Sequence, residues 1–559
     1  MASFVFDRFL RFDDLTTLLH EVAVEYADLC HLSEIGRSHE GRPIWLVTIT
    51  DSSAGAHDAK PALWVDASIH ATELSATVAA LHLVHRLVTG HDEVVERARR
   101  TRTIYVVPRV NPDGAEAALA ERPRRLRSST RPWPWNDPRP RPGFYEDDLD
   151  GDGRVLQMRV VDPDGAWKQH PDEGRLLVAR GPADDPAAPY YRLLPEGTIV
   201  DFDGVTIALP GPPEGLDLNR NFPAGWKPQG EQKGSGDHPG SEPEVRALID
   251  AVTARPNICA YVALHTCGGV LLRPSSMKPD DQLPRSDLLT FNAIGRIGAD
   301  ITGYPTYSTF HDFTHSPTAT MTGAADDWAY DHLGLAAWTV EIWDPVKAGV
   351  GEHKHPIRWN EQHPVADDLA MLAWADRYPG AFVDWYPFDH SQLGAVELGG
   401  WDYLHAWGNP PSALLEDEVS KVSLFLVHHA LLTPELRVHS ADAVAVGDGT
   451  WRVRVVVANV GWLPTNVTER ATQAGVVRPL VAELLVADGV EVVSGQRRLE
   501  LGQLAGRPIG GPAFAPWSSD GTADRAKAEW VVTGSVGTEI IVEIAHQRAG
   551  RARVSLTLP

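Results

Sequence analysis

The chain has 559 residues, a formal net charge of −24 and a hydrophobic fraction of 43%. This length exceeds what one hydrophobic core usually supports, so we expect at least two domains. The acidic balance, without any block of Lys or Arg, argues against nucleic acid or an anionic membrane as a partner. The three cysteines are too few, and odd in number, for a disulfide framework.

The N-terminal segment carries charged residues where a signal peptide needs an uninterrupted apolar core. No apolar run elsewhere approaches the length of a membrane span. The sequence therefore predicts a cytoplasmic enzyme.

The first predicted elements are an amphipathic helix over 12–29 and a strand over 44–49. Residues 63–90 then predict a buried strand followed directly by a helix. His70 lies where this strand ends, and Glu73 lies where the helix begins. Ligands bind at such junctions in open α/β sheets, and an imidazole and a carboxylate at this spacing can supply two ligands to Zn²⁺.

A second His-x-x-Glu pair, His170 and Glu173, stands among Pro, Asp and Gly residues with no strand before it. We interpret this pair as part of a loop. It lies within residues 122–213, which contain no long periodic segment and follow a predicted strand over 103–107. Because a structureless loop of that length is uncommon, we interpret 122–213 as an inserted subdomain.

The inserted subdomain contains Asp148, Asp150 and Asp152 at the spacing of the first half of a calcium loop. The twelfth position of that loop is Arg159 instead of the usual Glu. A Ca²⁺ site at the three aspartates and a simple Asp/Gly turn are therefore equal alternatives.

Two further predicted strands end in residues that can act at the same site. The apolar run 258–264 leads into His265, and the strand 336–340 leads into Glu341. Three protein ligands with an open fourth position for water define a catalytic zinc site, and a nearby carboxylate can deprotonate that water. A lone strand-end His or Glu is more often an ordinary polar residue, so the conjunction carries the prediction. Helices are predicted over 241–254, 288–301 and 415–432.

After residue 433 the pattern changes to Val-rich alternating stretches separated by Gly, Asp, Pro and Asn. Roughly seven short strands at this spacing predict a C-terminal β-sandwich over 433–559. The sandwich offers no cluster of candidate ligands, so we expect the chemistry to lie in a catalytic domain over 1–432.

Six motifs, in order, resemble those of the zinc carboxypeptidases of the pancreatic carboxypeptidase A type. The resemblance covers about residues 10–432 without the insertion. The motifs are HATE at 70–73, NPDG at 111–114, DLNRNF at 217–222, SEPE at 241–244, VALHT at 262–266 and TVE at 339–341.

The resemblance implies a mixed, mainly parallel eight-stranded sheet flanked by helices, and a zinc metallocarboxypeptidase, that is, a hydrolase acting in proteolysis. It implies one catalytic Zn²⁺ bound by His70, Glu73 and His265. Glu341 would take a proton from water and pass it to the leaving amine.

The substrate implied by the resemblance is a peptide or small amide with a free terminal carboxylate. Asn219 and Arg220 would hold that carboxylate, since a guanidinium matches a carboxylate bidentately. A nearby arginine should stabilise the oxyanion. Arg127 is our choice for this role, and Arg125 is the alternative.

The family's mobile substrate-binding tyrosine corresponds to Ala319 here, which has no hydroxyl, and Thr318 and Thr320 are short neighbours. At the base of the family's side-chain pocket stands Asp326, which implies a preference for C-terminal Lys or Arg because a buried carboxylate favours a cationic guest. The alternative is that Asp326 only caps a helix. The insertion should border the active-site entrance.

Two other functions remain as hypotheses. An amidase or deacylase of the same scaffold would act on a branched or non-peptide amide, although relatives that deacylate amino acids generally lack the NRN segment. A non-catalytic zinc-binding protein would work through its β-sandwich, although such chains usually lose a ligand or the base.

Overall fold

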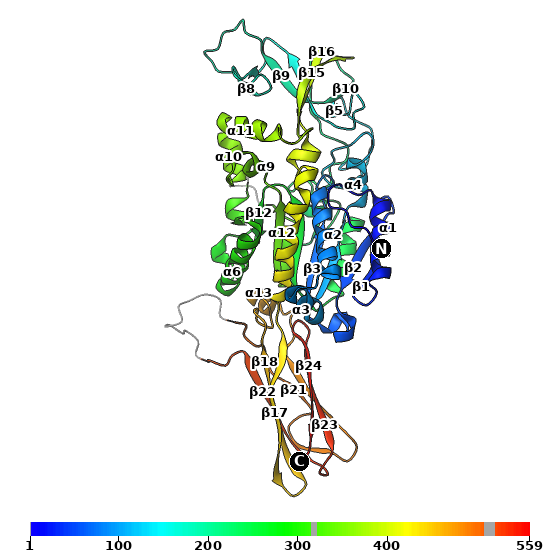
Figure 1. Cartoon of the computed structure of the whole chain (residues 1–559), viewed down its shortest axis with the longest axis vertical. Helices are drawn as coiled ribbons and strands as arrows, with labels where there is room; N and C mark the ends of the chain where they lie inside the picture. The colour runs from blue at the N-terminus through cyan, green and yellow to red at the C-terminus, as the bar shows by residue number, and fades with distance from the viewer. Residues whose placement is uncertain (1, 315–320, 508–519) are drawn as a thin grey trace.

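The computed structural model describes residues 2–314, 321–507 and 520–559. The molecule is elongated, with an α/β domain in the middle, an antiparallel subdomain at the top and the C-terminal β domain at the bottom (Figure 1). Within the described ranges, no helix combines the length and apolarity that crossing a bilayer requires.

An eight-stranded sheet forms the centre of the α/β domain, in the order β1-β2-β4-β3-β11-β14-β12-β13. The β3–β4, β3–β11, β11–β14 and β12–β13 pairs are parallel, and the others are antiparallel. This confirms the predicted fold class. The strands are β1 (Cys30–Arg37), β2 (Pro43–Ile49), β3 (Ala62–Ala67), β4 (Thr103–Val107), β11 (Ile258–Thr266), β12 (Val270–Arg273), β13 (Thr306–Ser308) and β14 (Ala336–Ile342).

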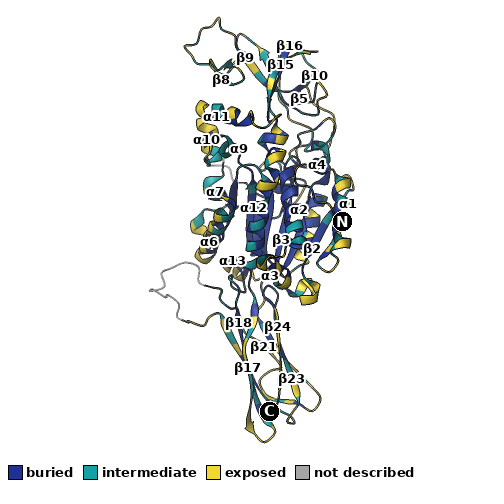
Figure 2. Ribbon diagram, viewed as in Figure 1, coloured by how far each residue is buried: buried dark blue, intermediate teal, exposed yellow. Residues whose placement is uncertain are grey.

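The central strands read as continuous apolar runs because helices cover both faces of the sheet. Every residue of β3 is buried, and the sheet is the most buried part of the molecule (Figure 2). The helix α2 (Leu74–Thr89) follows β3 and packs against α12 (Ser412–Leu431), with the Arg86 guanidinium donating to Ser420 and Ser423.

The other helices of this domain lie around the sheet or over its edges. They are α1 (Phe12–Glu25), α3 (Glu93–Thr101), α4 (Pro112–Ala118), α5 (Pro243–Thr253), α6 (Arg285–Thr302), α7 (Thr309–Asp312), α8 (Ala325–Asp331), α9 (Pro345–Val350), α10 (Pro356–Gln362) and α11 (Val365–Ala375).

The residues between 122 and 213 form strands of an antiparallel subdomain, which two later strands complete. A six-stranded sheet has the order β15-β16-β6-β9-β7-β8, and β5 pairs with β10. The sequence did not predict β15 and β16: β15 has one fully buried residue, and the buried positions of β16 do not alternate. The strands are β5 (Gly143–Glu146), β6 (Gln157–Val161), β7 (Trp167–Gln169), β8 (Leu177–Ala179), β9 (Tyr191–Pro195), β10 (Gly197–Val200), β15 (Phe382–His390) and β16 (Gly394–Trp401).

The C-terminal domain consists of two four-stranded antiparallel sheets, β17-β18-β22-β20 and β21-β19-β23-β24. Alternate residues of β18 and β23 face a shared apolar core, as expected for a strand with one buried face. The strands are β17 (Leu436–Gly447), β18 (Thr450–Asn459), β19 (Val481–Val486), β20 (Glu491–Ser494), β21 (Arg498–Glu500), β22 (Arg525–Thr533), β23 (Glu539–His546) and β24 (Gly550–Thr557). The short helix α13 (Glu469–Gln473) lies between β18 and β19 in the chain.

Candidate active site

Four of the predicted site residues come together at the carboxyl ends of β3, β11 and β14, three neighbouring parallel strands. His265, near the end of β11, is the register partner of Glu341 on β14. His70 and Glu73 lie in the loop that joins β3 to α2. Parallel strands end at the same edge of a sheet, so side chains that are far apart in sequence meet here.

The two histidines and Glu73 are arranged as ligands of one cation. The Nδ1 atom of His70 lies 2.7 Å from Oε1 of Glu73, and Nδ1 of His265 lies 2.9 Å from Oε2 of the same carboxylate. The two Nδ1 atoms are 3.1 Å apart. Burial opposes ionisation of Glu73, but the two imidazoles hold its pKa well below the ordinary value. Two nitrogens and a carboxylate, all buried, form the donor set that Zn²⁺ takes in catalytic sites.

Asp217 orients His70, a role that the sequence analysis did not assign. The Nε2–H of His70 donates to Oδ1 of Asp217 over 3.2 Å, which leaves Nδ1 of the ring free to bind metal. Burial raises the pKa of Asp217, but the charges of Arg127, Arg220 and His70 outweigh it and keep the carboxylate ionised. The sequence feature that could have identified Asp217 was its position at the start of the DLNRNF segment.

Glu341 has an environment suited to proton transfer. Burial, together with the charge of Glu73, raises its pKa to about 7, although His265 and Arg127 oppose the shift. A base whose pKa lies near neutral pH can both accept and return a proton.

Arg127 lies beside the candidate metal ligands, whereas Arg125 does not. Nε of Arg127 donates to Oδ2 of Asp217 over 3.1 Å, and its Nη1 lies 3.5 Å from Oε1 of Glu73. About half of the Arg127 side chain is exposed, so a substrate can reach the guanidinium. Arg125 instead donates to Glu146 of β5 over 2.7 Å.

Asn219 and Arg220 lie in a short 3-10 turn, Leu218–Arg220. Oδ1 of Asn219 accepts from the backbone N–H of Ala325 over 2.8 Å, at the start of α8. Nη1 of Arg220 donates to the carbonyl of Asn219 over 2.6 Å. Among the described residues Arg220 forms no ion pair with a carboxylate. Its guanidinium can therefore form an ion pair with a carboxylate of a ligand.

Asp326 lies in the first turn of α8 and is only 4% exposed. Burial raises its pKa, while the charge of His265 and a hydrogen bond from the Thr339 hydroxyl lower it. The N-cap position of α8 is Ala324, not Asp326. No Lys or Arg of the described ranges forms an ion pair with Asp326. The residues predicted around the missing tyrosine, Thr318, Ala319 and Thr320, lie outside the described residues.

The predicted calcium loop has a different set of neighbours than its spacing suggested. Carboxylate oxygens of Asp148, Asp150 and Glu196 lie within 4.8 Å of one another, whereas Asp152 forms an ion pair with Arg154. Burial, followed by the charges of Asp150 and Asp148, raises the pKa of Glu196 to about 7. Since Glu196 also accepts backbone N–H groups of Leu149 and Leu156, calcium binding stays a prediction.

The fold is of the α/β class, and the ligand set fits one Zn²⁺. The chain belongs to the zinc carboxypeptidase family, whose model matches residues 15–360, and it is therefore a peptidase. A second model, for a domain of unknown function, matches residues 435–557. These matches confirm the family that the motifs resembled.

Individual relatives are distant. Carboxypeptidase B of Astacus astacus is 23% identical over 344 residues, which cover 60% of this chain and 86% of the relative. Carboxypeptidase A4 of Mus musculus is 22% identical, over 59% of this chain and 62% of the relative. Among solved structures, thrombin activatable fibrinolysis inhibitor is 19% identical over 66% of this chain and 74% of its own, with a TM-score of 0.39. Carboxypeptidase A from Helicoverpa armigera is 17% identical over 67% and 75%, with a TM-score of 0.38.

Proposed function

We propose that this protein is a zinc-dependent carboxypeptidase that hydrolyses the C-terminal peptide bond of its substrate, with Glu341 as the general base. One observation carries the proposal. The Nδ1 atoms of His70 and His265 meet the Glu73 carboxylate at the sheet edge where Glu341 stands in register with His265.

His70, Glu73 and His265 would hold the metal. When bound there, zinc would supply a Lewis acid for hydrolysis of the scissile bond. Glu341 accepts a proton from the attacking water and returns it to the leaving amine, which its pKa of about 7 suits. Arg127 donates to the carbonyl oxygen as negative charge develops on it.

Recognition of the chain end falls to residues around α8. The guanidinium of Arg220, which forms no ion pair within the described residues, binds the terminal carboxylate of the substrate together with the Nδ2 group of Asn219. Asp326, buried and without a basic partner among the described residues, accepts the side chain of a terminal Lys or Arg. The substrate is thus a peptide with a free C-terminus and, preferentially, a basic last residue.

The test is release of the last residue from a peptide by the purified zinc-loaded protein, compared with the same peptide amidated at its C-terminus and with an N-acyl amino acid. We expect hydrolysis of the free peptide only. Preference for the N-acyl amino acid would instead indicate a deacylase.

The general base is tested by Glu341→Gln. The amide cannot accept the proton, so we expect kcat to fall on the order of 10³-fold, about 4 kcal/mol in the barrier, with zinc content unchanged. The exposed Glu352→Gln is the matched control. Retention of more than about a tenth of the rate in Glu341→Gln would exclude the assigned role.

A further inference from the structure

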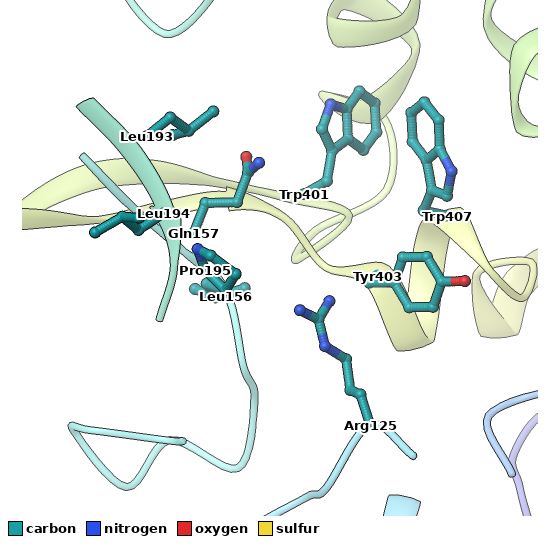
Figure 3. Close-up of a pocket in the computed structure, with 9 residues that line it drawn as sticks. All are labelled: Arg125, Leu156, Gln157, Leu193, Leu194, Pro195, Trp401, Tyr403 and Trp407. Atoms are coloured by element: carbon teal, nitrogen blue, oxygen red, sulfur yellow. The ribbon is translucent and has the colours of Figure 1, made fainter. Parts of the chain in front are cut away.

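A cavity of about 400 Å³ lies between the antiparallel subdomain and the turn Tyr403–Trp407 (Figure 3). Leu156 and Leu193, from the inserted segment, line one side. Trp401, Tyr403 and Trp407 line the opposite side, and Arg125 points in from below in this view. The walls come from the insertion, from the end of β16 and from the turn that follows it, so two additions to the central fold enclose it together.

The cavity lies next to the loop that carries His70 and Glu73. The buried side chain of Asn409 donates from Nδ2 to the carbonyls of Thr72 and Leu404, each over 2.9 Å, and accepts from Ser75 N–H over 2.8 Å. Thr72 stands between the two ligands of the His-x-x-Glu motif. Asn409 therefore links the turn that carries Tyr403 and Trp407 to the loop that carries His70 and Glu73.

Electrostatic contact supports this proximity. Burial raises the pKa of Tyr403 to about 12, and the charges of Glu73, Arg125 and Arg127 also act on its hydroxyl. The aromatic wall of the cavity thus shares the electrostatic environment of Glu73 and Arg127.

The chemistry of the lining favours an aromatic guest. The Trp401 and Trp407 rings lie 5.4 Å apart at 66°, an edge-to-face arrangement that leaves ring surface for a third aromatic group. The Arg125 guanidinium is the one charged group of the lining, and it is already engaged by Glu146 and by the Tyr403 ring, 5.3 Å away. The other lining residues are apolar or aromatic except Gln157, so most of the surface offered to a guest is apolar.

The position of Arg125 relates the cavity to the candidate active site. In the proposed function, Arg220 and Asp326 hold the last residue, and Arg127 marks the scissile carbonyl. Arg125, two residues before Arg127 in the chain, lines the cavity, whereas Arg220 and Asp326 do not. We therefore infer that the cavity lies on the amino side of the scissile bond.

We propose that this cavity, the upstream pocket, binds an aromatic side chain of the substrate on the amino side of the scissile bond. The proposal rests on the proposed function and narrows its substrates to peptides with an aromatic residue near, but not at, the C-terminus.

The experiment uses alanine peptides that end in Lys, with a single Phe moved through the four positions before the Lys. At one position we expect Phe to raise kcat/KM about tenfold over the all-Ala peptide, since apolar side-chain burial is of this order. Trp401→Ala and, as a milder second variant, Leu193→Asp should reduce this ratio to about twofold or less. Trp135→Ala, which removes an exposed tryptophan of the same subdomain, should keep it.

Binding is measured in parallel by calorimetry with the zinc-loaded Glu341→Gln variant. The same Phe position should lower Kd, and the additional Trp401→Ala change should abolish that effect. If no position of Phe improves either kcat/KM or Kd, or if both pocket variants keep the preference, the upstream pocket is wrong. If no peptide is cleaved but Phe still improves binding through Trp401, the proposed function fails and the pocket stands.

Discussion

The buried charged groups at the two ends of β3, β11 and β14 have different partners. At the carboxyl ends, His70, Glu73, His265 and Glu341 face mainly one another. At the amino ends, where the C-terminal domain docks, Arg548 is 3% exposed and donates to the carbonyls of Leu333, Gly334 and Asn466.

Asp287, beside the docked domain, is likewise a buried charged residue that bonds to backbone groups. Its carboxylate accepts from the backbone N–H groups of Glu469 and Arg470 and from the Tyr330 hydroxyl, over 2.7 to 3.0 Å. Buried polar groups that backbone donors and acceptors satisfy stabilise a structure, whereas titratable groups that crowd together with perturbed pKa values indicate a functional site. The carboxyl edge is thus built for chemistry and the amino edge for attachment.

The largest effect should come from His265→Ala. With one ligand lost, we expect zinc content to fall steeply and peptide hydrolysis to drop by on the order of 10³-fold or more. Metal analysis and kcat/KM on one protein sample check both. His170→Ala, in the second His-x-x-Glu pair, is the control and should change neither. Full zinc occupancy in His265→Ala would break the assignment of the carboxyl edge.

Asp326→Ala should reverse the preference between basic and apolar C-terminal residues, with a smaller effect on the rate than His265→Ala. Removing the buried carboxylate should lower kcat/KM for peptides that end in Lys or Arg by about 10- to 100-fold and raise it for those that end in Leu or Phe. The exposed Asp281→Ala serves as the comparison. Equal rates of the wild-type protein on both peptide classes would contradict the role of Asp326.

At the amino edge, Arg548→Ala should affect stability rather than catalysis. Three carbonyls lose a charged donor, so we expect a loss of about 2–4 kcal/mol in the free energy of unfolding. Denaturant unfolding and kcat/KM per zinc-loaded molecule separate the two effects. Arg551→Ala, at an exposed arginine of the same domain, should be nearly neutral. A fall in kcat/KM without loss of stability would contradict the assignment of a purely structural role to Arg548.

The smallest effect concerns calcium in the antiparallel subdomain. If Asp148, Asp150 and Glu196 bind Ca²⁺, millimolar Ca²⁺ should raise Tm by a few degrees through preferential binding to the folded state. Glu196→Gln should abolish the rise, and Asp152→Asn should keep it because Asp152 pairs with Arg154. An unchanged Tm of the wild-type protein at all Ca²⁺ concentrations would contradict calcium binding and favour the alternative, a simple Asp/Gly turn.

Local pattern predicted much of the catalytic domain. His70, His265 and Glu341 were found because each follows an apolar run, and strand ends at one edge of a parallel sheet converge whatever lies between them. The fold class followed from the resemblance of the ordered motifs. The strands β15 and β16 were missed because partly buried strands of a small subdomain leave a weak apolar period.

The sequence by itself determined the family, the α/β architecture and the residues gathered at the candidate metal site, because these depend on short motifs and on the period of apolar residues. Only the tertiary structure decided which distant groups act on them. Asp217 meets His70 across 147 positions, Glu196 joins Asp148 in place of Asp152, and Trp401 closes a cavity with Leu193. Such pairings depend on how strands and loops pack, and side-chain contacts between distant segments leave no periodic signal in the chain.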